Sequence, residues 1–328
     1  MEPGPCVRVA PPQGERTRSR LAEAGLLDGS REIHATEGSL LIPVTDSEKV
    51  PEDLEVISAE TPAREGQTTP ADLLSWDPSY ERVGDVAVID EDDPERAREL
   101  TDAIVDSDLP LETVLNKRSP IEGTERVREW AVLAGEGTTV RHREYGYEYA
   151  LDLAQVYFSP RLATERHRVA SQVEAGEQAF DMFAGVGPFV IPFADRGATC
   201  VAVDVNPAAI EYLRENAERN GVSDRITALC GDVREVAGDY TNWADRIVMN
   251  LPHSGAGFLE TAVGLAGERC RLHYYDIQHE DDPFGPGEAA IRAVAGSEYD
   301  VSVAERRVVR SYAPHELNVC LDIDLERA

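Results

Sequence analysis

The sequence predicts an α/β protein, with a helix-covered parallel sheet in the C-terminal half and two small α+β domains before it. Three observations support this fold class. From Tyr157 onward, short apolar runs alternate with amphipathic stretches, the rhythm of strand–helix units in a parallel sheet. The 328 residues, 42% of them hydrophobic, suffice for two or three domains with buried cores. A stretch rich in Pro, Thr, Glu and Ala near residue 60 marks a boundary.

Residues 1–48 are expected to form the first small domain. Hydrophobic patterning predicts its elements as a strand over Cys6–Val9, a helix over Gly14–Leu27, and strands over Ile33–Ala35 and Ser39–Val44. Residues 49–80 lack hydrophobic periodicity and contain several prolines, so we expect them to be an interdomain linker.

Residues 81–152 are expected to form the second small domain. A helix over Asp93–Val105 with proline in its first turn is flanked by predicted strands over Val86–Ile89, Thr113–Leu115, Val132–Leu133, Thr138–His142 and Tyr147–Leu153.

Residues 153–328 are expected to form the domain with the parallel sheet. The predicted strands are Gln178–Phe183, Thr199–Val203, Ile226–Leu229, Asp245–Met249 and Leu272–Asp276. The predicted helices between them include Pro188–Asp195 and Pro207–Asn220. Two further β-rich runs, Glu305–Ser311 and Asn318–Asp324, are expected to pair as a hairpin at the sheet edge, and Gly285–Gly287 falls in an acidic loop.

The charge of the chain is strongly acidic. Sixty-two Asp and Glu residues against 32 Lys and Arg give a net charge of −30, and Lys49 and Lys117 are the only lysines. Such an excess opposes a polyanionic partner in dilute buffer. An acidic, lysine-poor surface is also typical of proteins in multimolar salt, where the Debye length is about 3 Å. We therefore expect a halophilic source, in which local arginine clusters decide whether nucleic acid binds.

The sequence predicts neither a targeting segment nor a metal site. No run approaches the roughly 18 apolar residues that span a membrane, and Met1–Pro12 does not resemble a signal peptide. The odd number of scattered cysteines, without a CxxC pair or zinc-like spacing, predicts free thiols and no metal site; they are Cys6, Cys200, Cys230, Cys270 and Cys320. A cytoplasmic location follows as the expectation.

A glycine-containing turn follows the first predicted strand of the sheet. The segment Asp181-Met-Phe183-Ala-Gly185-Val-Gly187-Pro ends a strand and begins a helix, a place where glycines let a ligand approach the backbone. It departs from the dinucleotide pattern GxGxxG, because no glycine stands three residues after Gly187. Alone, this motif is a weak signal.

Polar residues also end the next three strands, where ligands bind in open α/β sheets. Asp204 is placed to accept two ribose hydroxyls, Asp232 to accept from an adenine amino group, and Asn250-Leu-Pro252 ends the fourth strand. Each acid alone is often a helix cap or turn residue. The four together resemble class I S-adenosylmethionine-dependent methyltransferases, whereas a nicotinamide cofactor leaves Asp232 and Asn250 unexplained. The resemblance implies cofactor-binding roles for Asp181, Phe183, Gly185, Gly187, Asp204, Asp232 and Asn250.

The segment Asn250-Leu-Pro252 is similar to the N-P-P-Y motif of amino-methylating enzymes, in which the Asn amide and a backbone carbonyl hold the methylated group. Leu251 and His253 depart from that motif, which disfavours adenine-N6 or glutamine methylation. Pyrimidine C5 methylation is also disfavoured, because neither Cys230 nor Cys270 follows a Pro or Thr.

Longer stretches resemble one family more closely, the archaeal and eukaryotic tRNA (guanine-37-N1)-methyltransferases. The stretches that resemble the family, in an order and spacing that also match it, are Gly123-Thr-Glu-Arg126, Val132-Leu-Ala-Gly135-Glu136, Tyr157-Phe-Ser-Pro-Arg161-Leu-Ala-Thr-Glu165-Arg166, Asp181–Pro188 and Asn250–Pro252. Gly25-Leu-Leu-Asp28 and Leu41-Ile-Pro-Val44 resemble the small N-terminal domain of the archaeal members, in keeping with a halophilic, archaeon-like source.

The resemblance implies a catalytic set. Guanine N1 must lose a proton, and Glu165 resembles the family's general base. Arg126 and Asn250 are expected to stabilise the negative charge that develops on O6, and Pro252 completes the catalytic set. Tyr157 and Arg161 are expected to line the cofactor entrance. S-adenosylmethionine is the implied cofactor.

The implied partner is a tRNA with guanine at position 37, whose base flips into the pocket. Backbone phosphates are expected to contact arginines, namely Arg141, Arg143, Arg166, Arg168 and the group Arg306, Arg307 and Arg310, together with Arg16 and Arg18 of the N-terminal helix. The N-terminal domain would check the outer corner of the tRNA. We expect a monomer that binds neither DNA nor membrane.

Two alternatives stay open. A wyosine-pathway tRNA transferase would use the same cofactor for aminocarboxypropyl transfer or for methylation of a tricyclic guanine; Asn250-Leu-Pro252 favours methylation over aminocarboxypropyl transfer. A non-catalytic tRNA-binding protein is disfavoured by the presence of Glu165, Arg126 and the cofactor-site acids.

Overall fold

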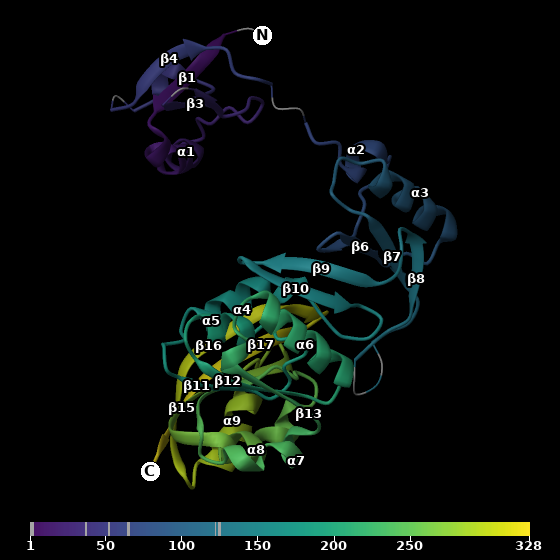
Figure 1. Cartoon of the computed structure of the whole chain (residues 1–328), viewed down its shortest axis with the longest axis vertical. Helices are drawn as coiled ribbons and strands as arrows, with labels where there is room; N and C mark the ends of the chain where they lie inside the picture. Colours follow the sequence, from purple (N-terminus) through teal and green to yellow (C-terminus); the bar gives the residue numbers. More distant parts are fainter. Residues whose placement is uncertain (1–2, 37, 52, 64–65, 122, 124–125) are drawn as a thin grey trace. The chain divides into compact units, whose positions relative to one another are not determined.

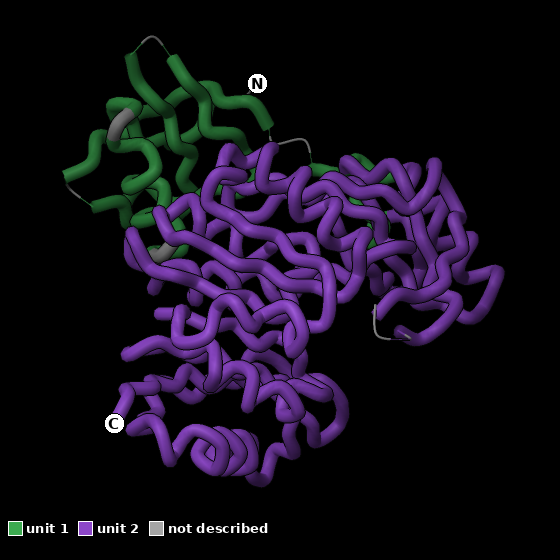
Figure 2. Tube along the Cα trace, turned by 60° about the horizontal axis from the view of Figure 1, so that its bottom comes forward, with its two compact units in different colours: residues 1–72, 107–109 green, residues 73–106, 110–328 purple. Residues whose placement is uncertain are grey.

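The computed structural model describes residues 3–36, 38–51, 53–63, 66–121, 123 and 126–328. The chain divides into two compact units (Figure 2). Unit 1 comprises residues 1–72 with 107–109, and unit 2 comprises residues 73–106 with 110–328. Among the described residues, no helix has the length and apolar character that crossing a bilayer requires.

Unit 1 is built on a four-stranded sheet with the strand order β2-β3-β1-β4. Its elements are β1 (Gly4–Val9), α1 (Gly14–Glu23), β2 (His34–Thr36), β3 (Ser39–Pro43) and β4 (Glu55–Ala59), followed by α2 (Pro70–Leu73) at the unit boundary. The predicted helix stops four residues early because Gly25 adopts a left-handed conformation with φ 67°. Val7, Leu21 and Ile42 are fully buried between α1 and the sheet.

The predicted linker over 49–80 is wrong in part. Strand β4 lies inside it and pairs antiparallel with β1, from Gly4 opposite Ala59 to Arg8 opposite Glu55. The alternating side chains of β4 are mostly exposed, so the segment carries no strong hydrophobic pattern and its strand character was not visible in the sequence.

The first part of unit 2 is a four-stranded sheet with the order β5-β6-β7-β8, covered by α3. The bounds are β5 (Glu81–Val83), β6 (Val86–Ile89), α3 (Pro94–Val105), β7 (Thr113–Lys117) and β8 (Trp130–Ala134). The predicted helix is confirmed as α3, with Pro94 in its first turn, and Asp93 caps it by accepting from the Glu95 N–H at 2.9 Å.

Strands β9 (Thr139–Glu144) and β10 (Tyr147–Asp152) form a separate two-stranded sheet. Asn216 of α6 (Pro207–Arg219) fixes this hairpin to the large sheet domain, because its side chain accepts from the Ala150 N–H at 2.7 Å and donates to the Ala150 carbonyl at 3.0 Å. The hairpin thus packs on the large sheet domain, although residues 81–152 were predicted as one domain.

The rest of unit 2 is a seven-stranded sheet with the order β13-β12-β11-β14-β15-β17-β16. It lies in the teal-green to yellow part of the chain in Figure 1. Its strands are β11 (Gln178–Asp181), β12 (Thr199–Asp204), β13 (Ile226–Cys230), β14 (Ala244–Met249), β15 (Ala266–His279), β16 (Tyr299–Ala313) and β17 (Glu316–Arg327). Strands β11–β15 are parallel, and β17 joins β15 antiparallel. The predicted fold class and the predicted edge hairpin are confirmed.

Helices cover both faces of this sheet. One face carries α4 (Ala163–Ala170), α5 (Val190–Asp195) and α6, and the other carries α7 (Val233–Val236), α8 (Leu259–Leu265) and α9 (Gly285–Ala295). The predicted acidic loop at Gly285–Gly287 is instead the start of α9. A Cβ at Gly287 would come within 2.9 Å of Leu321 Cδ1, so glycine lets α9 approach the sheet closely.

Candidate active site

The turn after β11 holds a buried carboxylate. Asp181 is 1% exposed, and its Oδ1 accepts from the Phe183 N–H at 3.1 Å, whereas its Oδ2 has no partner among the described residues. Burial, and to a lesser degree the charge of Asp204, raises the pKa of Asp181 to about 7. A buried acceptor without a partner is unusual, and it marks this turn as a place where a ligand supplies the missing donor.

Glycines shape the same turn. Gly185 and Gly187 have φ values of 53° and 91°. The Gly185 N–H donates to Asp204 Oδ2 at 2.7 Å, and the Asn206 N–H donates to Asp204 Oδ1 at 2.9 Å. Among the atoms of the described residues, a Cβ at Gly185 would meet one within 4 Å, the Tyr157 carbonyl oxygen at 4.0 Å. The open turn and the adjoining carboxylates fit a ligand that carries hydroxyl and amino donors.

Asp232 lies at the end of β13 in a more polar setting. It caps α7 by accepting from the Arg234 N–H at 2.9 Å, and the Arg234 side chain pairs with it and lowers its pKa. The Arg234 guanidinium lies 4.6 Å over the Phe258 ring, and Phe258 meets Phe183 edge to face at 5.0 Å. These side chains form one wall beside the strand ends.

Asn250 follows β14 directly and is half-buried, while Pro252 is buried. The Leu251 carbonyl accepts from the N–H groups of Ser254 and Gly255, at 3.1 and 2.8 Å, which closes a tight turn after Asn250. His253 points away to the surface and hydrogen-bonds the Tyr312 hydroxyl at 2.9 Å.

Arg126 and Tyr157 come together although 31 residues separate them. Arg126 has a left-handed backbone with φ 55°, and its guanidinium lies 4.8 Å over the half-buried Tyr157 ring. A residue other than glycine in this conformation is strained. The exposed Arg161 forms an ion pair with Glu81 of β5 at 3.0 Å.

Glu165 of α4 is 4% exposed, accepts three hydrogen bonds and forms a further ion pair with Arg307. Its Oε1 accepts from Arg168 Nη2 at 2.7 Å and from the Tyr275 hydroxyl at 2.9 Å. Its Oε2 accepts from Arg168 Nε at 2.9 Å and lies 3.0 Å from Arg307 Nε. Tyr275 follows Tyr274, which pairs in register with Met249, so Glu165 lies near the level of Asn250.

Two arginines expected at phosphates are corrected by the structure. Arg166 is 3% exposed, donates to Glu144 Oε1 at 2.8 Å and reaches the Ser159 carbonyl at 3.1 Å. Burial opposes ionisation of Glu144, but its bonds with Arg166 outweigh burial and lower the Glu144 pKa. Arg168 is engaged with Glu165 and Asp322. Both guanidinium groups are committed to interior carboxylates, so neither is presented to RNA.

Four further arginines that are expected to contact RNA lie at the surface, two on β9 and two on α1. Arg141 and Arg143 of β9 are exposed and line a cavity of about 250 Å³ with Arg219 of α6, and Arg143 pairs with Glu148. In unit 1, Arg18 of α1 pairs with Glu15 at 2.6 Å, and Arg16 is exposed. Their contacts with RNA remain predictions.

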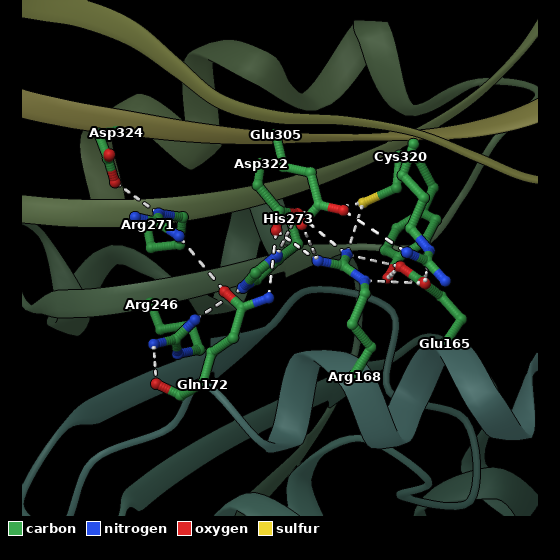
Figure 3. A network of polar contacts seen from close by, with 12 residues as sticks. Glu165, Arg168, Gln172, Arg246, Arg271, His273, Glu305, Cys320, Asp322 and Asp324 are labelled. Atoms are coloured by element: carbon green, nitrogen blue, oxygen red, sulfur yellow. Dashed lines mark hydrogen bonds and ion pairs between the residues drawn. The ribbon is translucent and has the colours of Figure 1, made fainter.

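A buried polar network behind Glu165 was not predicted (Figure 3). Asp322 of β17 accepts from Arg168 and from His273 of β15, and His273 contacts Arg246 of β14 at 2.8 Å. The side-chain atoms of His273, Cys320 and Asp322 that could bind a metal ion lie within 4.8 Å of one another. Arg168, however, already donates to Asp322, and Arg246 donates to His273. The sequence signal that could have indicated this network is a histidine within the apolar run Leu272–Tyr275.

Comparison with family models covers most of the chain. Residues 139–301 match the TRM5/TYW2 methyltransferase domain, residues 6–52 match the tRNA methyltransferase 5 N-terminal domain, and residues 66–138 match the TYW2 N-terminal domain.

Individual relatives match along nearly the full length. The tRNA (guanine(37)-N(1))-methyltransferase Trm5b of Pyrococcus abyssi is 40% identical over 327 residues, covering 97% of this chain and 98% of the relative. A solved complex of aTrm5 with tRNALeu is 32% identical, with TM-score 0.71 and coverage of 98% and 99%. Methanocaldococcus jannaschii Trm5 bound to adenosine is 30% identical, with TM-score 0.66 and coverage of 99% and 100%.

Proposed function

The chain belongs to the TRM5/TYW2 methyltransferase family, and we propose that it is an S-adenosylmethionine-dependent enzyme that methylates N1 of guanine 37 in tRNA. The observation that carries this conclusion is the near full-length match to Trm5b, in a chain that keeps Glu165, Arg126 and Asn250. S-adenosylmethionine supplies an electrophilic methyl group whose transfer leaves the thioether product.

The residues of this chain have defined tasks in that reaction. Glu165 takes the N1 proton onto a carboxylate oxygen, and the N–H electron pair stays on N1 to form the new bond to the methyl carbon. Arg126 and Asn250 donate to guanine O6, where the negative charge accumulates. Their positions on separate elements of one unit hold the base in line with the methyl donor.

The strand ends would hold the cofactor. Asp204, already oriented by two backbone N–H groups, would accept the ribose hydroxyls. Asp181 Oδ2 would accept a hydrogen bond from the cofactor's amino group. The open turn at Gly185 leaves room for the cofactor beside the protein backbone. Asp232 and Phe183 would border the adenine, and Tyr157 and Arg161 the entrance.

The wyosine-pathway alternative is less well supported. The matched catalytic model spans both branches of the family. The match of residues 6–52 to the tRNA methyltransferase 5 N-terminal domain favours the guanine-37 branch, as does Asn250-Leu-Pro252. A second methylation of a tricyclic guanine would use the same residues.

Several finer features belong to the same proposal. Unit 1 would recognise the outer corner of the tRNA through Arg16 and Arg18. The net charge of −30 with two lysines supports a halophilic, archaeon-like source. We place the protein in the cytoplasm as a monomer that acts on tRNA and not on DNA or membranes.

The test is single-turnover methylation of transcript tRNA with labelled S-adenosylmethionine in high potassium chloride, followed by nucleoside mass analysis. Matched guanine-37 and adenine-37 transcripts would be compared. One-methylguanosine from the guanine transcript alone supports the proposal. An aminocarboxypropyl product, or no product despite cofactor binding in calorimetry, contradicts it.

A further inference from the structure

The carboxylate proposed as the general base is already engaged by donor groups. An ionised carboxylate offers about four lone-pair sites. Glu165 accepts one hydrogen bond from Tyr275 and two from Arg168, and Arg307 Nε forms an ion pair with its Oε2 at 3.0 Å. We expect guanine N1–H to reach an oxygen of Glu165 only after one of these groups has moved.

Arg168 is held in place from behind. Its Nη1 lies 2.6 Å from Asp322 Oδ2 and 3.0 Å from Glu305 Oε2, and its Nη2 lies 3.2 Å from Asp322 Oδ1 (Figure 3). The side chain is 14% exposed. Moving Arg168 would leave Asp322, which is 1% exposed, without its main counter-charge.

The anchor of Arg168 is itself fixed. Arg246 can only donate, so His273 Nε2 accepts from it at 2.8 Å, and His273 Nδ1–H donates to Asp322 at 2.7 Å. Burial lowers the pKa of His273 and keeps the ring neutral. Burial opposes ionisation of Asp322, but bonds from His273 and Arg168 hold its pKa well below the usual range. Arg168 is thus the residue that positions Glu165.

Tyr275 is equally unable to leave. It is 1% exposed, and burial raises its pKa well above the usual value, so its hydroxyl remains a donor. The Tyr275 ring packs against Phe189 at 6.0 Å. Oε1 of Glu165 is therefore permanently occupied by Tyr275 and Arg168.

Arg307 is different. It lies on β16, the edge strand of the sheet, and its side chain is 39% exposed. Its other acidic neighbour, Glu305, is 3.5 Å away and itself 42% exposed. Among the described contacts of Glu165, that of Arg307 is the one that a ligand at the surface can break without opening the interior.

We propose that Arg307 covers Glu165 Oε2 in the free enzyme and moves to an RNA phosphate when tRNA binds, so that Oε2 becomes the acceptor for guanine N1–H. The inference rests on the proposed function. A phosphate suits the guanidinium group as a bidentate partner. The exchange makes the base available only when RNA is present, while Arg168 keeps its orientation.

The charges around Glu165 give the sign of the test. The cationic groups beside Glu165 are Arg168 and Arg307, and the anionic groups nearby are Glu305 and Asp322; Tyr275 and Cys320 are neutral because burial raises both pKa values. Removing the Arg307 charge should therefore move the acid limb of the methylation rate to higher pH in any state in which Arg307 contacts Glu165. Second-order rate constants report the free enzyme, and limiting rate constants report the complex.

The experiment uses Arg307→Gln in the full chain, with single-turnover methylation of tRNA from pH 5.5 to 9 at saturating S-adenosylmethionine. We expect the acid limb of the second-order rate constant to move up by about half to one pH unit. The acid limb of the limiting rate constant should stay in place, and the Kd for tRNA should rise several-fold.

Arg269→Gln is the matched control. It removes one arginine from β15 in the same sheet, where the side chain is 84% exposed and 3.8 Å from Glu326, and we expect neither limb to move. Arg307→Lys keeps the charge and should leave both limbs in place. It also serves if Arg307→Gln fails to fold, because its loss of tRNA affinity tests the phosphate contact.

Equal shifts of both limbs would show that Arg307 remains on Glu165 in the complex and would overturn the inference, as would no shift in either limb or unchanged tRNA affinity in Arg307→Lys. The proposed function fails by a different result, the absence of one-methylguanosine from the wild-type reaction.

Discussion

Two carboxylates of unit 2 are held in opposite ways. Asp204 is oriented by backbone N–H groups of Gly185 and Asn206, which lie in the turns after β11 and β12. Glu165 is oriented by side chains, those of Arg168, Tyr275 and Arg307, and the last two lie more than 100 residues away in the chain.

The difference separates two kinds of site. Backbone donors form together with the parallel strands, so the cofactor region depends on local turns. The region around Glu165 forms only when β15, β16 and β17 have assembled beside α4. Changes at the first should act on cofactor affinity, and changes at the second on the chemical step and on stability.

The largest expected effect is that of Glu165→Gln. The amide cannot take the N1 proton, so we expect the single-turnover rate to fall by about 10²–10⁴-fold. The Kd for S-adenosylmethionine, measured by calorimetry, should change less than twofold because the cofactor turn is separate. A full rate in the variant would show that another group is the base.

Asp322→Asn tests the same region from behind. The variant removes the charge that holds Arg168, and breaking a buried ion pair typically costs about 3–5 kcal/mol. We expect the urea midpoint of unit 2 to fall clearly and the methylation rate to fall about tenfold. All three tryptophans, Trp76, Trp130 and Trp243, lie in unit 2, so fluorescence reports its unfolding.

Asp324→Asn is the control for that variant. It lies two residues further along β17 and pairs with Arg271 at a side-chain exposure of 37%. An exposed pair contributes about 0–1 kcal/mol, so midpoint and rate should stay near those of the wild type. Equal losses in both variants would mean that the network does not position Glu165.

The two regions also differed in how far sequence could predict them. The turn motif at Asp181–Pro188 and the acids at strand ends are local, because parallel strands bring their carboxyl ends to one edge. The positions of Asp204, Asp232 and Asn250 at that edge followed from strand prediction alone.

The partners of Glu165 could not be predicted in this way. Their assembly depends on the antiparallel register of β15 and β17, which sets His273 opposite Asp322. Strand patterning predicts that both segments are strands but not which residues face each other across the pair. For the same reason Arg166 and Arg168 were predicted at phosphates, although both face interior carboxylates.

Asp204→Ala tests the region whose carboxylate is held by backbone N–H groups. Loss of hydrogen bonds from ribose hydroxyls to a charged acceptor costs about 1.5–3 kcal/mol, so we expect the Kd for S-adenosylmethionine to rise roughly 10- to 100-fold. The rate at saturating cofactor should stay within threefold. Asp224→Ala, in the exposed turn before β13, is the control and should change neither quantity.

Asp181 predicts a smaller, pH-dependent effect. Its pKa of about 7 is raised by burial, so the carboxyl is largely protonated below pH 7 and ionised above it. If the ionised form accepts from the cofactor's amino group, the Kd should rise up to about tenfold between pH 8 and pH 6. Calorimetry on Asp181→Asn should show weaker binding without that dependence.

The same group predicts the sign of a stability change. A raised acid pKa means that the ligand-free folded state binds the proton more tightly than the unfolded chain. Stability should therefore increase as pH falls from 8 toward the unfolded value of about 4, through this group alone. Comparing urea midpoints of wild type and Asp181→Asn across that range isolates the contribution.

The smallest effects are expected for exposed arginines that belong to neither of these two regions. Among the described residues, none forms an ion pair with Arg141, whereas Glu148 already neutralises Arg143. Arg141→Ala should therefore weaken tRNA binding more than Arg143→Ala, by a few-fold. It should also reduce the salt slope of log Kd by about 1.

Because a phosphate contact positions RNA without touching the reaction, the limiting methylation rate should remain at the wild-type value. A lower limiting rate in Arg141→Ala would mean that the β9–β10 hairpin takes part in placing guanine 37, and the separation between RNA contacts and the chemical step would no longer hold.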